Sequence, residues 1–192
     1  MKVPRNLIKA VRDDLRDAGV SSAKTDVFYL LGYASGLNMT DIILNPQKLE
    51  KTINYCLLRE CVNRRINCEP ISKIIKRKDF WDLSFFVNSK VLDPRPETEL
   101  LVNEVLRNSK NNGERILDLG TGSGCIAISV ASKLSKAQVI GSDISREALE
   151  VAEYNNLVNL TSVRLVESDW FAKIEGTFDI IVSNPPYLSE PE

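Results

Sequence analysis

The feature that most constrains the fold is a glycine-rich turn, Gly120-Thr121-Gly122-Ser123-Gly124, which joins two regular patterns. The run from Arg115 to Leu119 has the length of a buried β-strand, and Ile126 to Leu134 keeps the spacing of a helix. Glycines allow positive φ and let a ligand approach the backbone closely. The sequence therefore predicts a strand, a ligand-binding loop and a helix in succession.

Helical and strand patterns alternate throughout the second half of the chain. The expected elements, in the order helix, strand, helix, strand, helix, strand, strand, are Glu97 to Arg107, Arg115 to Leu119, Ile126 to Leu134, Gln138 to Gly141, Arg146 to Leu157, Val163 to Val166 and Phe178 to Val182. Alternation of this kind produces a parallel sheet with helices on its faces. We therefore predict an α/β fold for residues 93–192.

The first 70 residues carry a helical pattern instead. Apolar positions keep the 3.6-residue spacing of a helix from Pro4 to Gly19, from Ser21 or Ser22 to Gly36, and from about Gln47 to Arg65. We predict a small helical domain over residues 1–70.

Short β-prone runs follow this domain. Ile71 to Ile75 and Ser84 to Val87 read as strands, and the polar stretch Lys76 to Asp79 separates them. The sequence predicts a β-hairpin linker over residues 71–92.

The composition excludes several kinds of chemistry. The chain has no histidine, which removes the commonest general base and every Ser-His or Cys-His nucleophile. Its four cysteines, Cys56, Cys61, Cys68 and Cys125, form no CxxC pair and indicate reduced thiols, so we expect no metal site. No apolar run approaches the roughly 20 residues that span a bilayer, and we expect a cytoplasmic protein with no membrane partner.

The charge is unevenly distributed along the chain. Residues 1–96 carry 17 Lys and Arg against 11 Asp and Glu (+6), and residues 97–192 carry 8 against 15 (−7), for a net charge of −1. The whole chain lacks the strongly basic character of a nucleic-acid binder. We expect the two halves to face different partners, and we do not expect nucleic acid to be one of them.

Two acidic residues indicate which cofactor the glycine loop binds. Asp143 lies 19 residues after Gly124 at the end of the next strand, where a carboxylate can accept both hydroxyls of a ribose. A dinucleotide would also suit this pattern, but Asp118, two residues before Gly120, would repel a pyrophosphate and suits an ammonium group. The pattern therefore favours S-adenosylmethionine over a dinucleotide, with a purely structural turn as the alternative.

An aromatic pair follows the third expected strand. In Ser168-Asp169-Trp170-Phe171, the acid and the flat ring of Trp170 lie where open α/β sheets bind ligands, and together they can bracket an adenine. Taken alone, a Trp-Phe pair is more often part of the packing.

The last expected strand leads directly into Asn184-Pro185-Pro186-Tyr187. Two prolines with fixed φ make a rigid turn without backbone donors, so the Pro185 carbonyl and the Asn184 side-chain carbonyl can accept two N–H bonds from one NH2 group. Tyr187 can stack on the planar group that carries this nitrogen. The motif predicts a site that holds a planar amide or amino nitrogen for attack on the methyl group of a sulfonium. This reaction needs neither histidine nor metal.

These segments resemble the bacterial protein-(glutamine-N5) methyltransferases that modify peptide chain release factors. The Asn-Pro-Pro-Tyr motif is shared with adenine-N6 DNA methyltransferases and some ribosomal RNA enzymes, whereas Pro94-Arg95-Pro96-Glu97-Thr98-Glu99 is far more specific. The resemblance covers most of the chain beyond residue 69 and is carried by Glu69-Pro70-Ile71, Phe80-Trp81, Val91 to Val102, Leu117 to Ala127 and Ser183 to Tyr187.

The resemblance implies a class I Rossmann-like methyltransferase sheet, and a helical N-terminal domain that docks the release factor. The reaction it implies is methylation, by S-adenosylmethionine, of the glutamine side-chain nitrogen in the factor's Gly-Gly-Gln loop. The cofactor-binding residues that it implies are Gly120, Thr121, Gly122, Ser123, Gly124, Asp143, Trp170 and Asn184. The substrate-binding residues that it implies are Asn184, Pro185, Pro186 and Tyr187, of which Asn184, Pro185 and Tyr187 are the catalytic ones.

The chain departs from the family pattern in three places. Asp93 stands where the family usually has an aliphatic residue, and the usual glycine near Arg77 is missing. Family members also continue past Asn-Pro-Pro-Tyr, so we expect about four of the seven strands and a sheet that is incomplete at its C-terminal side. On this basis we expect the 192-residue chain alone to be inactive.

Three other functions stay open at this point. A nucleic-acid amino-methyltransferase would share the Asn-Pro-Pro-Tyr motif, and a ribosomal-protein glutamine would present the same chemical group. An inactive, truncated relic is the third alternative.

Overall fold

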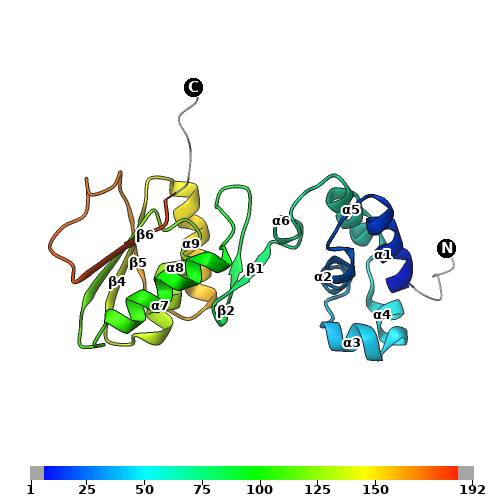
Figure 1. Ribbon diagram of the computed structural model, residues 1–192, viewed down its shortest axis with the longest axis horizontal. Coiled ribbons are helices and arrows are strands. Elements are labelled where there is room, and N and C mark those ends of the chain that lie inside the picture. The colour runs from blue at the N-terminus through cyan, green and yellow to red at the C-terminus, as the bar shows by residue number, and fades with distance from the viewer. Residues whose placement is uncertain (1–6, 186–192) are drawn as a thin grey trace, which may run out of the picture. The chain divides into compact units, whose positions relative to one another are not determined.

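The computed structural model describes residues 7–185 and divides the chain into two compact units, Met1–Ile75 and Lys76–Glu192 (Figure 1). None of the helices within residues 7–185 is long and apolar enough to cross a membrane. The two units have separate apolar cores, as expected for a change from a helical to an alternating pattern along the sequence.

The first unit is a bundle of helices around one core. Leu15, Leu30, Leu31, Ile42 and Ile74 are fully buried in it. The helices are α1 Leu7–Asp17, α2 Ala23–Ser35, α3 Met39–Leu44, α4 Pro46–Thr52, α5 Tyr55–Ile66 and α6 Ile71–Ile75 (Figure 1).

Asparagine caps divide this bundle more finely than the apolar spacing predicts. The helix expected from Gln47 to Arg65 is interrupted, because the Asn54 side chain accepts a hydrogen bond from the Leu57 amide at 3.1 Å and starts α5. Asn38 starts the unexpected helix α3 in the same way, through the Asp41 amide at 2.8 Å. Such caps stabilise a new helix start by about 1 kcal/mol each.

The prediction of a strand at Ile71–Ile75 is wrong, since these residues form α6. The amides of Lys73 and Ile74 donate to the Pro70 carbonyl, and Ile74 is buried in the helical core. The hairpin instead pairs β1 Arg77–Phe80 with β2 Leu83–Phe86, so most of the polar stretch expected to separate the two strands is itself a strand. Phe80 and Phe85 are buried on one face of this hairpin. Their rings pack edge to face, with centroids 6.1 Å apart.

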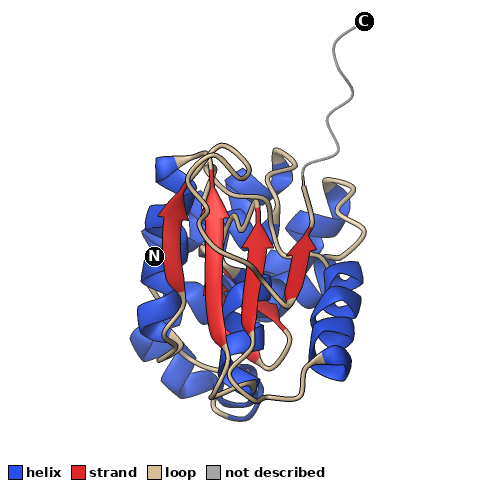
Figure 2. Ribbon diagram, turned by 90° about the vertical axis from the view of Figure 1, so that its left-hand side faces the viewer, coloured by secondary structure: helices blue, strands red, loops and turns tan. Residues whose placement is uncertain are grey.

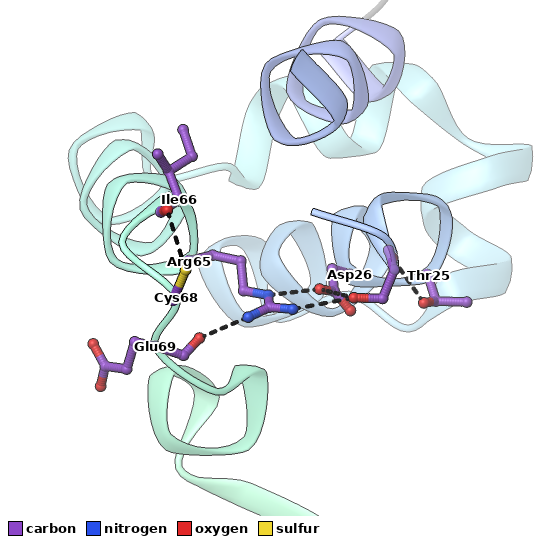
Figure 3. Close-up of polar contacts among 7 residues, drawn as sticks. Thr25, Asp26, Arg65, Ile66, Cys68 and Glu69 are labelled. Atoms are coloured by element: carbon purple, nitrogen blue, oxygen red, sulfur yellow. Dashed lines mark hydrogen bonds and ion pairs between the residues drawn. The ribbon is translucent and has the colours of Figure 1, made fainter. Parts of the chain in front are cut away.

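A buried ion pair ties three segments of the helical unit together (Figure 3). The Arg65 Nε donates to Asp26 Oδ2 at 2.7 Å, and their side chains are only 19% and 5% exposed. Ser22 Oγ donates to the same carboxylate oxygen at 2.7 Å and accepts from Arg65 Nη2 at 3.1 Å. Arg65 Nη1 also donates to the Glu69 carbonyl at 3.1 Å. The guanidinium therefore links the start of α2 to the end of α5 and to the segment that leads into α6.

The second unit is an α/β layer structure, which confirms the predicted fold class. Its four-stranded parallel sheet has the order β5-β4-β3-β6 (Figure 2), and α7, α8 and α9 pack against its strands. The strands are β3 Arg115–Leu119, β4 Gln138–Asp143, β5 Arg164–Glu167 and β6 Ile180–Ser183, and the helices are η1 Pro96–Thr98, α7 Glu99–Asn108, α8 Cys125–Lys133 and α9 Arg146–Val158.

Strand β3 lies inside the sheet and forms the centre of the core. Ile116 is buried in one cluster with Val102 of α7 and Ile128 of α8, and Leu117 is buried in a second cluster with Leu119 and Ile140 of β4. β6 pairs only with β3 within residues 7–185, and of its residues only Val182 is buried. The Ile181 side chain of this strand is 52% exposed.

We predict that Asp26→Ala destabilises the helical unit by about 2 to 4 kcal/mol, because it leaves the Arg65 guanidinium largely buried without its counter-charge. Far-UV circular dichroism during urea unfolding measures this loss. Both tryptophans, Trp81 and Trp170, belong to the second unit, so their fluorescence transition should stay unchanged. The control is Asp17→Ala, which removes an acid whose side chain is 70% exposed and should change stability by less than about 0.5 kcal/mol. Equal effects of the two variants would contradict the prediction.

Candidate cofactor and acceptor site

The register of the sheet brings the glycine loop and Asn184 to the same place. Leu119 of β3 pairs with Ser183 of β6, and Ser183 Oγ donates to the Leu119 carbonyl at 2.8 Å. Gly120 and Asn184 are the next residues of the two strands, so they leave the sheet side by side. This is the carboxyl end of a parallel sheet, where open α/β folds bind their ligands.

The glycine loop uses its three glycines in two ways. Gly120 and Gly122 have φ of 70° and 55°, and a Cβ added at either position would meet nothing within 4 Å. At Gly124, with φ of 81°, an added Cβ would lie 2.7 Å from Ile128 Cδ1 and 3.3 Å from Ala152 Cβ. The first two glycines therefore expose bare backbone, and the third allows α8 to pack closely against α9.

Asp143, predicted to hold a ribose, braces this loop from the end of β4. Its Oδ2 accepts from the Gly122 amide at 2.8 Å, and its Oδ1 accepts from the Ser145 amide at 2.9 Å. The Asp143 carbonyl also accepts from the Ser168 amide at 2.9 Å. One residue thus connects the glycine loop with the segments that follow β4 and β5, and its contact with a ribose stays a prediction.

Asp118 is a buried acid beneath the loop. Its Oδ2 accepts from Thr121 Oγ1 at 2.7 Å and from the Ala127 amide at 3.2 Å. Its Oδ1 has no hydrogen-bond partner among the described residues, although the side chain is almost completely buried. Burial raises the pKa of Asp118 from 3.8 to about 6, and the neighbouring charge of Asp143 adds to the increase. A cationic group placed nearby would stabilise the ionised form.

Trp170 and Phe171 are not part of the core. Their side chains are 59% and 54% exposed, and Trp170 has a φ of 46°. Ser168 maintains this turn, because its Oγ donates to the Trp170 carbonyl at 2.9 Å and accepts from the Lys173 amide at 3.0 Å. The indole is therefore presented on the loop that follows β5, and its stacking on an adenine stays a prediction.

The acceptor motif is described as far as Pro185. Asn184 Nδ2 donates to Thr98 Oγ1 at 2.9 Å, and Thr98 is buried at the start of α7. Pro185 is exposed at the end of the same turn. The predicted substrate-binding residues Pro186 and Tyr187 lie outside the described residues.

Thr98 was missing from the predicted site residues. Its signal was the segment Pro94 to Glu99, which the sequence singled out without assigning a contact to any side chain in it. The same segment holds the hairpin, because Glu99 Oε1 accepts from the Trp81 amide at 3.0 Å. One short segment thus contacts both the acceptor motif and the β1–β2 turn.

Asn155 was missed altogether. It is fully buried on α9, and its Nδ2 donates to the Ser123 carbonyl at 2.9 Å and to the Phe86 carbonyl at 3.0 Å. Its Oδ1 accepts from the Phe86 amide at 2.7 Å. The side chain therefore bonds the glycine loop to β2, and the only signal in the sequence was a polar residue within an apolar helical stripe.

A parallel sheet with a glycine loop after its central strand is the architecture of a methyltransferase domain, and residues 87–192 match the family model described as Methyltransferase small domain. Residues 6–75 match the model described as PrmC N-terminal domain. The chain belongs to the release factor glutamine methyltransferase family.

Three relatives illustrate the similarity, each named release factor glutamine methyltransferase. The Caulobacter vibrioides protein is 39% identical over 183 residues, covering 93% of this chain and 63% of the relative. The Agrobacterium fabrum protein is 37% identical over 186 residues, covering 93% and 64%. The Haemophilus influenzae protein is 34% identical over 197 residues, covering 95% and 67%. The chain thus spans about two thirds of the length of these relatives.

We predict that Asp118→Asn makes the α/β unit more stable above pH 6, by up to about 3 kcal/mol, when no ligand is present. The raised pKa means that the folded unit binds a proton more tightly than the unfolded chain between about pH 4 and pH 6. Wild-type stability therefore falls as pH rises through this window, whereas an asparagine does not ionise and can still accept the bonds from Thr121 and Ala127. Urea unfolding followed by tryptophan fluorescence at several pH values measures the difference.

The matched control for this experiment is Asp82→Asn, which changes an acid whose side chain is 82% exposed. The difference between wild type and Asp118→Asn should be small below pH 4 and reach its full size above pH 6. Parallel stability curves for wild type and Asp118→Asn across this range would contradict the prediction.

Proposed function

We propose that the protein transfers a methyl group from S-adenosylmethionine to the side-chain amide nitrogen of the glutamine in the Gly-Gly-Gln loop of a peptide chain release factor. The observation that carries this proposal is the pairing of Leu119 with Ser183, from which the glycine loop and Asn184 follow side by side. The names of the relatives support the substrate, since each is a release factor glutamine methyltransferase.

The residues around the glycine loop fit S-adenosylmethionine. This cofactor supplies a methyl group bound to a positively charged sulfur and also carries an ammonium group. The open backbone at Gly120 and Gly122 allows close approach, and Asp118 has a buried oxygen without a hydrogen-bond partner among the described residues. In the proposal, the segment from Gly120 to Gly124 and Asp143 hold the cofactor, with Trp170 against the adenine.

Asn184 and Pro185 prepare the acceptor nitrogen in this proposal. An amide nitrogen is a poor nucleophile because its lone pair is delocalised into the carbonyl. The Asn184 side-chain oxygen and the Pro185 carbonyl accept the two N–H bonds and direct the lone pair toward the methyl carbon. The nitrogen–carbon bond would form as the sulfur–carbon bond breaks, which leaves S-adenosylhomocysteine, and the strongly acidic methylated nitrogen would lose one proton to water as the products leave.

This reaction suits a site without a base or a nucleophilic side chain. The chain has no histidine, and burial raises the pKa of the Cys125 thiol beside the loop to about 12, so this thiol stays neutral. Positioning and exclusion of water then supply most of the rate in the proposal. The nucleic-acid alternative is not favoured, because the relatives are named for a protein substrate.

The helical unit has a separate role in the proposal. We assign release-factor docking to residues 1–70, a linker to residues 71–92 and cofactor binding to residues 93–192. Its excess of basic residues suits an acidic protein surface, with association that weakens as salt rises. A protein acting on release factors works in the cytoplasm, where translation terminates.

Transfer of a labelled methyl group tests this function directly. The complete protein is incubated with labelled S-adenosylmethionine and a release factor, and tandem mass spectrometry locates the label. We expect one methyl group on the Gly-Gly-Gln glutamine and none on a factor in which that glutamine is replaced by glutamate. Label incorporated into DNA, ribosomal RNA or a ribosomal protein instead would overturn the assignment of the substrate.

We predict that Asp143→Ala weakens S-adenosylmethionine binding by about 1 to 3 kcal/mol, or roughly 5- to 150-fold, because Gly122 and Ser145 lose their shared acceptor. Isothermal titration calorimetry measures the affinity. Asp82→Ala, which removes an exposed acid from the same unit, should bind as the wild type does. Unchanged affinity in a folded Asp143→Ala variant would remove Asp143 from the cofactor site.

We predict that Asn184→Ala lowers kcat by at least about a hundredfold and changes S-adenosylmethionine affinity less than about twofold, since the side chain holds the acceptor and not the donor. Steady-state kinetics and calorimetry on the complete protein give the two quantities. Asn112→Ala, a change at an exposed position of the same unit, is the control. Similar losses in both quantities would mean that Asn184 shapes the cofactor pocket or the fold.

A further inference from the structure

Thr98 and Asn184 form a contact between distant parts of the sequence. The two residues are 86 positions apart, and the Asn184 Nδ2 donates to Thr98 Oγ1 at 2.9 Å. Thr98 is 5% exposed, and such a buried hydroxyl needs partners within the protein. A hydrogen bond between these two side chains is therefore part of the interior of the acceptor site.

Both residues have fixed backbones. The Thr98 amide donates to the Arg95 carbonyl at 2.9 Å, and the following residue, Glu99, is anchored on the Trp81 amide at 3.0 Å. Asn184 follows Ser183, whose backbone is paired with β3 and whose hydroxyl is bonded to the Leu119 carbonyl. The bond to Thr98 therefore acts mainly by restricting rotation about the Asn184 side-chain torsions.

The orientation of this amide matters because its two ends have opposite hydrogen-bonding properties. The nitrogen end only donates and the oxygen end only accepts, so a side chain turned end over end would present donors to the donors of a substrate NH2 group. The amide is planar, so directing Nδ2 to Thr98 also fixes the direction of Oδ1. In the observed orientation Nδ2 is the end bonded to Thr98, and the bond holds the side chain with Oδ1 as its other end.

We propose that Thr98 is a positioning residue for methyl transfer, acting through Asn184 by holding its side-chain nitrogen so that its oxygen accepts the acceptor amide of the substrate. This inference rests on the proposed function. It gives the Pro94 to Glu99 segment a role in the reaction, in addition to its place at the start of α7.

Two substitutions in the complete protein separate the hydroxyl from the packing of the side chain. Thr98→Val keeps the shape and removes the acceptor, and we expect kcat to fall about 10- to 100-fold while S-adenosylmethionine affinity stays within about twofold. Thr98→Ser restores the hydroxyl and should recover kcat to within about threefold of wild type. Thr177→Val, at an exposed position in the same unit, should match the wild type.

A second measurement reads the contact without any turnover. In protein with nitrogen-15 labelling, the Asn184 side-chain amide protons should shift and exchange faster with water in Thr98→Val, and should resemble the wild type in Thr98→Ser. Wild-type kcat in Thr98→Val would overturn the proposal, as would unchanged Asn184 amide signals. Equal losses of kcat and cofactor affinity in both Thr98 variants would also overturn it, since they indicate a purely structural role.

The wild-type control distinguishes this proposal from the proposed function. If wild-type protein binds S-adenosylmethionine but methylates no glutamine, the proposed function fails, and the role of Thr98 in that reaction fails with it. If wild-type protein methylates the release factor and Thr98→Val does so equally well, only the role of Thr98 fails.

Discussion

The backbone pairing of β3 with its two neighbours determines where the glycine loop, Asp143 and Asn184 lie. Leu119 is opposite Ser142 of β4 on one side and opposite Ser183 of β6 on the other. Gly120, Asp143 and Asn184 are the residues that follow these three, so the glycine loop, its bracing acid and the acceptor motif all begin at one level of the sheet. A register shift of one residue would turn each strand's side chains to the opposite face and separate the three groups. The parallel hydrogen bonds of β3 are thus the constraint on which the site depends.

Local patterns in the sequence were sufficient to predict the strands and helices that carry the site. The strand from Arg115 to Leu119 was predicted with its observed bounds, and the helix expected from Arg146 to Leu157 ends one residue later, at Val158. These elements are encoded by apolar spacing within a dozen residues, and the glycine loop by residues that are adjacent in the sequence. The strand expected from Phe178 to Val182 begins at Ile180, because the Asp179 amide and carboxylate bond to the backbone of Arg115 before the ladder of β6 starts.

Contacts that depend on distant residues could not be predicted in the same way. The residues from Ile71 to Ile75 are β-prone, yet they form a helix because Ile74 is buried against the bundle, and no local pattern encodes that packing. Asn155 satisfies the backbone of Phe86 and Ser123, which lie 69 and 32 residues away. The sequence marked Asn184 as functional and the segment containing Thr98 as distinctive, but only the folded chain brings the two side chains together.

The electrostatics of the loop connect the stability of the unit with the ligand that it is proposed to bind. Asp118 and Asp143 are like charges, and the burial of Asp118 makes its ionised form unfavourable in the unliganded protein. A cation bound beside the loop stabilises that form, so cofactor binding and the ionisation of Asp118 favour each other. Any ligand that binds only the folded state also stabilises it by mass action. Under the proposed function, the same carboxylate weakens the empty unit and strengthens its complex with a positively charged cofactor.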